Sequence, residues 1–211
     1  WYHRFGQVRV NLLAEGFYTN LKDVFVLEDI SKEDGILTKE RRNGSGAEVM
    51  GVNLEARAVF TRWLELQAGA TLQRSRYKEP EVWSENPEVP AEKRLFRTPD
   101  VYGYFTALLN PLKRFSASLA GTYTGRMLVQ HMAGVIVADR VEKTPDFFVL
   151  ELKLAYDMPL YKEVTLQWSA GVRNIFDAYQ RDFDQGADRD SGYMYGPGIP
   201  RSYYAGVKIV F

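Results

Sequence analysis

Apolar and polar residues alternate with a period of two along much of this sequence. The clearest example spans residues 164–173, where Leu166 and Trp168 alternate with Gln167 and Ser169. Successive side chains of a β-strand point to opposite faces, so a strand separates these two sets completely, whereas a helix would scatter them around its circumference. The alternation therefore predicts strands that each place one face in an apolar environment and the other in a polar one.

The same alternation recurs often enough to predict about nine strands. Most of them run roughly 9–13 residues, the length that a tilted strand needs to cross a bilayer, whereas strands of soluble proteins are typically about 5–6 residues long. Strand length therefore favours an all-β fold, a transmembrane antiparallel β-barrel, over a soluble β-sandwich. The predicted strands are residues 8–15, 24–30, 50–57, 64–73, 101–109, 115–124, 147–157, 164–173 and 201–211.

The predicted connections fall into two classes, short and long, that alternate along the chain. Outer-membrane barrels of bacteria have tight turns on the periplasmic side and long loops outside. The last strand is therefore expected to end at the periplasmic rim with Phe211, and the first strand, about residues 5–18, is expected to run the same way. The short connections lie around residues 20–23, 60–62, 110–114 and 159–163, and the long ones at residues 31–46, 78–97, 127–146 and 176–199.

Composition excludes several classes of function. The 27 Lys and Arg residues balance 27 Asp and Glu residues, so the net charge gives no reason to expect a nucleic-acid partner. The absence of cysteine excludes thiol catalysis and thiolate metal sites. The sequence also contains no nucleophile elbow, phosphate loop or zincin motif. We therefore predict a protein that is not an enzyme and carries no cofactor.

The C-terminal segment 203–211 is the most specific motif. Its alternate residues are apolar or aromatic, and the chain ends on an aromatic ring. This pattern is similar to the C-terminal signal that the outer-membrane assembly machinery reads, an amphipathic strand with an aromatic end. The residues predicted to form this assembly signal are Tyr203, Val207, Ile209 and Phe211.

Two further motifs resemble those of TonB-dependent receptors. Residues 172–177 read Val172-Arg173-Asn174-Ile175-Phe176-Asp177, and residues 196–201 read Gly196-Pro197-Gly198-Ile199-Pro200-Arg201. In that family the penultimate strand commonly ends in an Asn-Leu-Phe-Asp-like run, and the last strand is entered through a Pro-Gly-x-Pro-Arg-like turn. The strand-turn-strand pattern of residues 15–23 is a looser match.

The resemblance implies a fold, a location and a function. Family members are 22-stranded barrels of the Gram-negative cell outer membrane, with an N-terminal plug and a segment that engages TonB. They take up a scarce nutrient such as an iron chelate, cobalamin, a glycan or a peptide, in some cases with a surface lipoprotein. Residues 1–211 are thus expected to be the C-terminal portion of such a barrel, without its plug domain and N-terminal strands, embedded in membrane lipid. The remaining barrel is expected in the same chain or a companion chain.

A passive porin or a small complete outer-membrane barrel is the alternative. Single-chain bacterial barrels ordinarily have an even number of strands, so a count of about nine argues against it. The sequence does not identify the nutrient.

Four residues of the predicted external loops are candidate ligand contacts, because aromatic rings offer contact area at low entropic cost. The alternatives are packing of loop on loop, or a place in the aromatic belt at the membrane interface. The four residues are Trp83, Tyr193, Met194 and Tyr195.

No metal site is predicted. The acidic run 181–192 suggests calcium because its Asp residues supply hard oxygen ligands, but it lacks EF-hand spacing and a closing Glu. Arg181 and Arg189 are available to pair with its carboxylates, so a solvated or self-paired loop is favoured. His3 and His131 lie far apart in the sequence and are expected at the surface.

Overall fold

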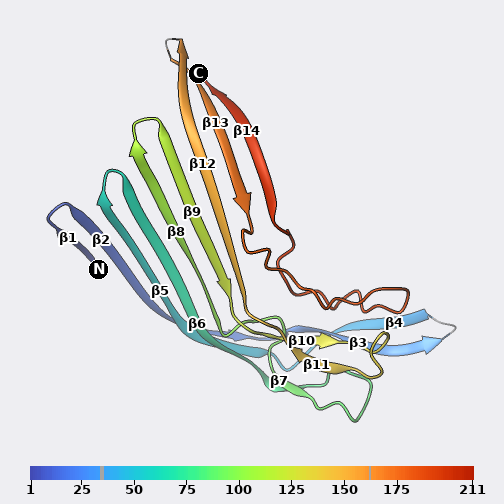
Figure 1. The fold of residues 1–211 in the computed structure, drawn as a ribbon. Coiled ribbons are helices and arrows are strands. Elements are labelled where there is room, and N and C mark those ends of the chain that lie inside the picture. The colour runs from blue at the N-terminus through green and yellow to red at the C-terminus, as the bar shows by residue number, and fades with distance from the viewer. Residues whose placement is uncertain (34–35, 162) are drawn as a thin grey trace.

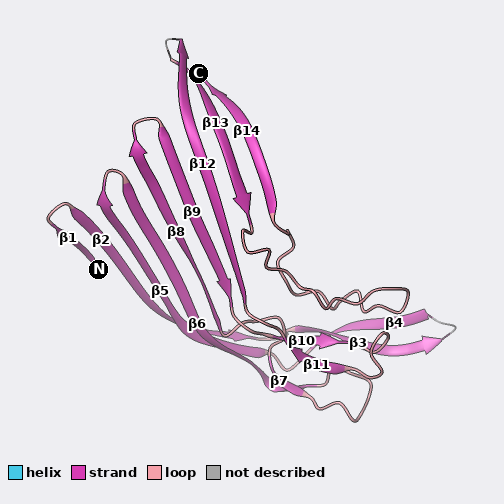
Figure 2. Cartoon of the chain, viewed as in Figure 1, coloured by secondary structure: helices cyan, strands magenta, loops and turns pink. Residues whose placement is uncertain are grey.

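The computed structural model describes residues 1–33, 36–161 and 163–211, and they form strands, turns and loops (Figure 2). Within these residues no helix is long and apolar enough to cross a membrane. A ten-stranded antiparallel sheet follows the order β1-β2-β5-β6-β8-β9-β12-β13-β14, with β7 paired to β6 (Figure 1). Its strands are β1 (Tyr2–Phe5), β2 (Val8–Leu21), β5 (Ala47–Thr61), β6 (Leu64–Glu81), β7 (Glu92–Arg94), β8 (Val101–Leu112), β9 (Phe115–Thr124), β12 (Phe147–Tyr161), β13 (Val164–Arg173) and β14 (Ser202–Val210).

Four strands lie outside this sheet as two hairpins. β3 (Phe25–Glu33) pairs with β4 (Ile36–Asn43), and β10 (Leu128–His131) pairs with β11 (Arg140–Lys143). The prediction of a barrel strand at residues 24–30 is therefore wrong, because this segment belongs to the β3–β4 hairpin, which projects away from the sheet (Figure 1).

The direction predicted for the first strand is also wrong. β2 runs toward the long-loop end, and the turn expected at residues 20–23 leads into the β3–β4 hairpin. The chain then returns as β5, which pairs antiparallel with β2 over Arg9–Leu21. The predicted number of about nine wall strands still agrees with the nine strands in the sheet order. The sequence pattern did not reveal β1 as a separate strand, and β1 takes the place of the segment 24–30 in that order.

The other connections follow the predicted alternation. Short turns at residues 62–63 and 113–114 lie at one end of the sheet, together with the end of β12 and the start of β13; part of the short connection predicted at residues 159–163 lies outside the described residues. The connections from β6 to β8, β9 to β12 and β13 to β14 gather at the other end (Figure 1). β14 runs toward the short-turn end, as predicted.

The strand register joins the apolar faces of the individual strands into one continuous surface, which we call the outer face. Residues that pair directly across antiparallel strands point to the same side of the sheet. One row of such residues crosses the sheet through Val10, Ala58, Leu66, Ala107, Leu119, Leu152, Val172 and Tyr203. On β6 every outer-face residue from Leu64 to Leu72 is apolar, a nine-residue run that suffices for a tilted strand to cross a bilayer.

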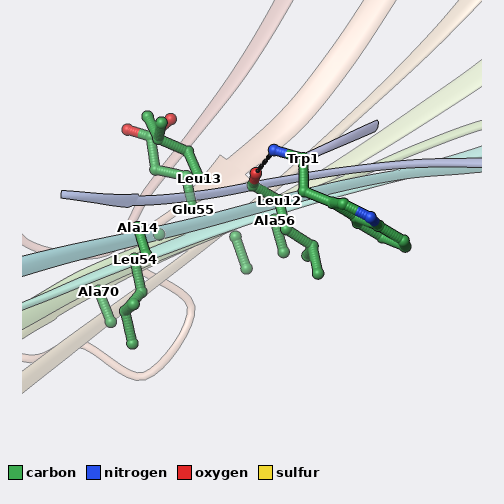
Figure 3. A pocket seen from close by; sticks show the side chains of 10 residues that line it. Trp1, Leu12, Leu13, Ala14, Leu54, Glu55, Ala56 and Ala70 are labelled. Atoms are coloured by element: carbon green, nitrogen blue, oxygen red, sulfur yellow. Dashed lines mark hydrogen bonds between the residues drawn. The ribbon is translucent and has the colours of Figure 1, made fainter. Parts of the chain in front are cut away.

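The opposite surface, the inner face, carries the polar side chains. The Arg57 guanidinium pairs with the Glu65 carboxylate at 2.7 Å, and the Gln67 amide donates to the Tyr104 hydroxyl at 3.2 Å. Figure 3 shows the separation on β2 and β5: Leu12 and Leu54 lie on one side of the strands, and Glu55 lies on the other. Near Trp1 the alanine side chains of β2, β5 and β6 leave an open hollow of about 680 Å³.

Glycine lets aromatic rings lie flat on the inner face. A Cβ atom at Gly69 would lie 2.5 Å from Cε1 of Tyr104, and one at Gly171 would lie 2.5 Å from the ring of Tyr204. Either contact is shorter than van der Waals separation, so a larger residue would displace the ring.

The outer face is not the interior of a sandwich. Trp168 is 49% exposed and Ile209 is 53% exposed, and no second sheet covers them among the described residues. A monomeric soluble protein rarely exposes so large a continuous apolar surface. The fold is therefore part of the wall of an antiparallel barrel whose outer face suits hydrocarbon.

A charge on the outer face is expected to destabilise the fold much more than the same charge one residue away. Leu66→Arg should lower the free energy of unfolding from lipid vesicles by about 2–4 kcal/mol, because the guanidinium would be buried in hydrocarbon. The neighbouring Gln67→Arg places the same group on the inner face and should cost far less. Urea titration of both variants in vesicles measures the difference, and equal losses would show that the two faces do not differ in environment.

Candidate functional site: the loop assembly at the long-loop end

The long loops have a hydrophobic core of their own. Met127, Val129 and Tyr193 are buried together, and Tyr195 packs against them. We call these four residues the loop core. The Tyr195 ring lies 6.1 Å from the ring of Phe147, whose side chain points to the inner face of the sheet. The loop connecting β13 to β14, residues 174–201, therefore folds over the inner side of the wall.

His131 lies inside this assembly, with only 3% of its surface exposed. Its ring stacks on Tyr193 with 3.6 Å between centroids, and its Nε2 lies 3.1 Å from both carboxylate oxygens of Asp184. The prediction of a surface position for His131 is wrong, because loop 174–201 covers the β10–β11 hairpin. His3 is exposed, as predicted.

Asp182 connects two tyrosines of the loop core. Its carboxylate accepts hydrogen bonds from the hydroxyl groups of Tyr193, at 2.9 Å, and Tyr195. Desolvation alone would raise the pKa of Asp182, but these hydrogen bonds outweigh it and the pKa lies below its ordinary value. Burial and the Asp182 charge raise the pKa of Tyr193 to about 12, so its hydroxyl stays protonated as a donor at neutral pH.

Asp184 and Asp190 organise the turn between these elements. The backbone N–H of Asp190 donates to Asp184 at 2.9 Å, and this hydrogen bond is the main cause of a lowered Asp184 pKa, with His131 adding to it. The Asp190 carboxylate accepts from the backbone N–H groups of Met132 and Gly192. Three carboxylates of the acidic run, those of Asp182, Asp184 and Asp190, thus accept hydrogen bonds from amides, tyrosines and a histidine.

The two arginines that were available to pair with these carboxylates make other contacts. Arg189 donates to the carbonyl oxygen of Gly186, and the Arg181 guanidinium lies 5.3 Å from the centroid of the Tyr179 ring. Across the part of the chain that the structure describes, no group of three or more His, Asp or Glu side chains is placed to hold a metal ion.

Asn174 and Asp177 close the base of loop 174–201. Asn174 is 1% exposed, and its side-chain amide donates to the carbonyl oxygens of Ala178 and Ile199, both at 2.9 Å. Asp177 accepts the backbone N–H of Arg201 at 2.9 Å. Asn174 has a φ of 50° and Asp177 a φ of 54°, left-handed values that Asn and Asp tolerate better than most residues. The motif noticed in the sequence is therefore a clasp between β13 and the start of β14.

The four candidate ligand contacts have different surroundings. Tyr193 and Tyr195 are held in the loop core, whereas Met194 between them is 69% exposed. Trp83 lies in the β6–β8 connection, where its indole N–H donates to Pro90 at 3.3 Å and its ring packs edge-on against Phe96. Arg97 fixes the Met194 segment by donating to the carbonyl oxygens of Met194 and Gly192. Ligand contact by the four residues stays a prediction.

The sequence pattern did not reveal the part played by His131, Gln180 and Arg97. The Gln180 amide donates to the Tyr193 carbonyl oxygen at 3.0 Å and accepts the N–H of Tyr195 at 2.8 Å, so it bridges both sides of the loop. These contacts join residues that lie far apart in the chain. The loop sequences that contain them show no periodic pattern from which the contacts could be predicted.

Three solved structures share this fold over most of the chain. The ferric-catecholate import receptor Fiu from E. coli K12 superposes with a TM-score of 0.60 at 21% identity, over 94% of this chain and 24% of Fiu. The copper transporter OprC gives 0.62 at 18% identity, over 98% of this chain and 29% of OprC. The siderophore receptor PiuA from Acinetobacter baumannii gives 0.61 at 16% identity, over 94% of this chain and 26% of PiuA.

These solved structures are TonB-dependent receptors. The chain has the fold of a TonB-dependent receptor barrel wall. It spans about a quarter of the length of these receptors. No family model matches the sequence, and neither does any curated protein. The strand and loop arrangement of the receptor barrel wall is thus shared although few residues are identical.

Removing the Asn174 side chain should open the loop at its base. Asn174→Ala leaves the N–H of Ala178 and two carbonyl oxygens without their partners, and buried groups left unpaired cost about 1–3 kcal/mol. Hydrogen exchange of the Ala178 amide should accelerate strongly. Asn86→Ala in the β6–β8 connection is the control, since the Asn86 side-chain oxygen accepts only one local backbone hydrogen bond. Unchanged exchange in Asn174→Ala would contradict the clasp.

The loop assembly should loosen in acid. Asp182 and Asp184 have lowered pKa values in the fold, so their contribution to stability is complete above the ordinary pKa of 3.8 and is lost as the pH falls through the lowered values. Near-ultraviolet circular dichroism of the stacked His131 and Tyr193 rings should lose intensity over that range. Asp184→Asn should weaken the signal at neutral pH, and Asp188→Asn, at an exposed position, should not.

Proposed function

We propose that this chain forms wall and external loops of a TonB-dependent receptor in the outer membrane of a Gram-negative bacterium. The observation that carries the proposal is the outer face, which is apolar and uncharged over a bilayer-spanning height and has all long loops at one end. The fold shared with Fiu, OprC and PiuA supports it.

The function proposed for the assembled protein is energised uptake of a scarce nutrient. Iron chelates and metal ions are the first substrate classes to test, because Fiu is a ferric-catecholate import receptor and OprC a copper transporter. Cobalamin, a glycan or a peptide are further classes of the same function. The loops of this chain would contribute to the ligand-facing surface without covalent chemistry.

The proposed partners follow from the open edges of the sheet. Backbone N–H and C=O groups cannot remain unpaired in hydrocarbon, so β14 at one edge, and β1 with the part of β2 that β1 does not cover at the other, require neighbouring strands. We propose that further barrel strands supply them, in the same or a companion chain, and that a plug inside the barrel couples to TonB. A surface lipoprotein over the loops is compatible with their exposed position.

Orientation can be tested with single cysteines, because the chain has none. Met194→Cys and Val137→Cys should react with a membrane-impermeant maleimide on intact cells, since both positions are exposed in long loops. Lys113→Cys, in a short turn, should react only after the outer membrane is permeabilised. Labelling of Lys113→Cys on intact cells with protection of Met194→Cys would contradict the proposed orientation.

Uptake measurements separate the receptor from a passive porin. Accumulation of a labelled ferric chelate or copper by cells that express the protein should stop when TonB is deleted or the inner membrane is uncoupled. Diffusion through a porin would persist under both conditions. Persistent uptake would therefore support the passive barrel and overturn the energised mechanism.

A further inference from the structure

Three oxygen-bearing side chains of the loop assembly converge on one another. The Asp182 carboxylate accepts the Tyr193 hydroxyl on Oδ2 at 2.9 Å and the Tyr195 hydroxyl on Oδ1. The two hydroxyl groups also interact with each other. We call Asp182, Tyr193 and Tyr195 the phenol-carboxylate cluster. Each member of this cluster is thus in contact with the other two.

Packing fixes both tyrosines in this arrangement. The Tyr193 side chain is buried and its ring stacks on His131, while the Tyr195 ring packs edge-on against it with 5.4 Å between centroids. The Gln180 amide donates to the carbonyl oxygen of Tyr193 and accepts the backbone N–H of Tyr195. The two phenol oxygens are therefore positioned by contacts other than their own hydrogen bonds to Asp182.

The cluster is accessible to a cation and is not already neutralised. Asp182 is exposed, and within the described residues its carboxylate forms no ion pair. The adjacent Arg181 directs its guanidinium to the ring of Tyr179 instead. The Glu142 carboxylate adds negative potential at Tyr193. A cation that reaches the cluster would therefore meet negative charge without displacing a positive side chain.

The chemistry of the three ligands selects a hard trivalent cation. An octahedral ion with bonds of about 2.0–2.1 Å to hard oxygen ligands places adjacent oxygens about 2.9 Å apart. Tyr193 Oη and Asp182 Oδ2 already have this separation, 2.9 Å. Two phenolates and one carboxylate carry three negative charges, which a trivalent ion neutralises completely. Displacing the phenol protons needs a strong Lewis acid, because burial and Asp182 raise the pKa of Tyr193 to about 12.

We propose that the phenol-carboxylate cluster binds a ferric ion, with Tyr193 and Tyr195 as phenolate ligands and Asp182 as a carboxylate ligand. On binding, two phenol O–H bonds break, two iron–oxygen bonds form to the phenolates and two protons pass to the solvent, with no change in oxidation state. Water or a chelating anion supplies the remaining ligands. The inference deepens the proposed function and, as a step of uptake, rests on it, since the loops would hold ferric iron itself.

The test adds ferric nitrilotriacetate to the purified full chain in detergent micelles. Ferric phenolates absorb visible light by charge transfer from the phenolate to iron, so the wild type should develop a saturable visible band. Tyr193→Phe and Tyr195→Phe keep the rings of the loop core and should each weaken ferric binding by at least about tenfold, since the loss of even an outer partner of a metal ligand costs about 10–100-fold. The double variant should show no band.

Tyr179→Phe is the matched control, because it removes a phenol of the same loop that lies outside the cluster. It should keep both the band and the affinity. Asp182→Asn should weaken binding but retain the band at saturating iron, since both phenolates remain. Near-ultraviolet circular dichroism without iron checks that each variant keeps the loop core.

Two results would overturn the ferric site: no band in the wild type, or a band that the double variant retains. Displacement of the iron by excess calcium would also overturn it, because the cluster would then be a site for divalent cations.

The binding test is independent of transport. It uses purified protein without TonB, so a missing band refutes the ferric site and leaves the uptake proposal standing. Uptake of labelled iron that persists after TonB is deleted refutes the energised mechanism and leaves the band unaffected.

Discussion

The structure depends on two conditions that hold together: the outer face is apolar, and the backbone N–H and C=O groups of the strands are hydrogen-bonded to neighbouring strands. Over the height of the apolar outer face the strands of the wall place uncharged side chains outward, and each of β5, β6, β8, β9, β12 and β13 hydrogen-bonds to two neighbours. Hydrocarbon tolerates a strand only under both conditions, because a lone charge and an unpaired peptide group each cost several kcal/mol there. The polar inner face, the short turns and the gathering of long loops at one end follow from keeping these conditions across the width of a bilayer.

The period-two pattern predicted the strands of the wall because one face of each strand is apolar and the other polar, which alternates the residue type at every second position. It placed the strands that begin at Leu64, Phe115, Phe147 and Val164 correctly at their N-terminal ends, and the register confirms which residues share a face. The pattern failed at residues 24–30, because a hairpin outside the main sheet can alternate as a barrel strand does. That single error also reversed the predicted direction of the first strand.

The loop assembly could be predicted only in part. The Asn174–Asp177 motif drew notice through its resemblance to a family pattern, and the structure supplies the reason: both residues adopt left-handed backbone angles and bond across the loop base. The burial of His131 could not be predicted, since its partners Asp184 and Tyr193 lie 53 and 62 residues away in the chain. Contacts of this kind depend on how loops fold over one another, which no local periodicity encodes.

Fluorescence quenching tests the central claim most directly. In a variant that keeps Trp168 as its single tryptophan, lipids brominated along their acyl chains should quench the emission strongly, because the indole lies on the outer face. Moving the tryptophan one residue, to position 167, should turn it to the inner face and remove most of the quenching. Equal quenching at both positions, or protection of Trp168, would contradict the assignment of this face to hydrocarbon.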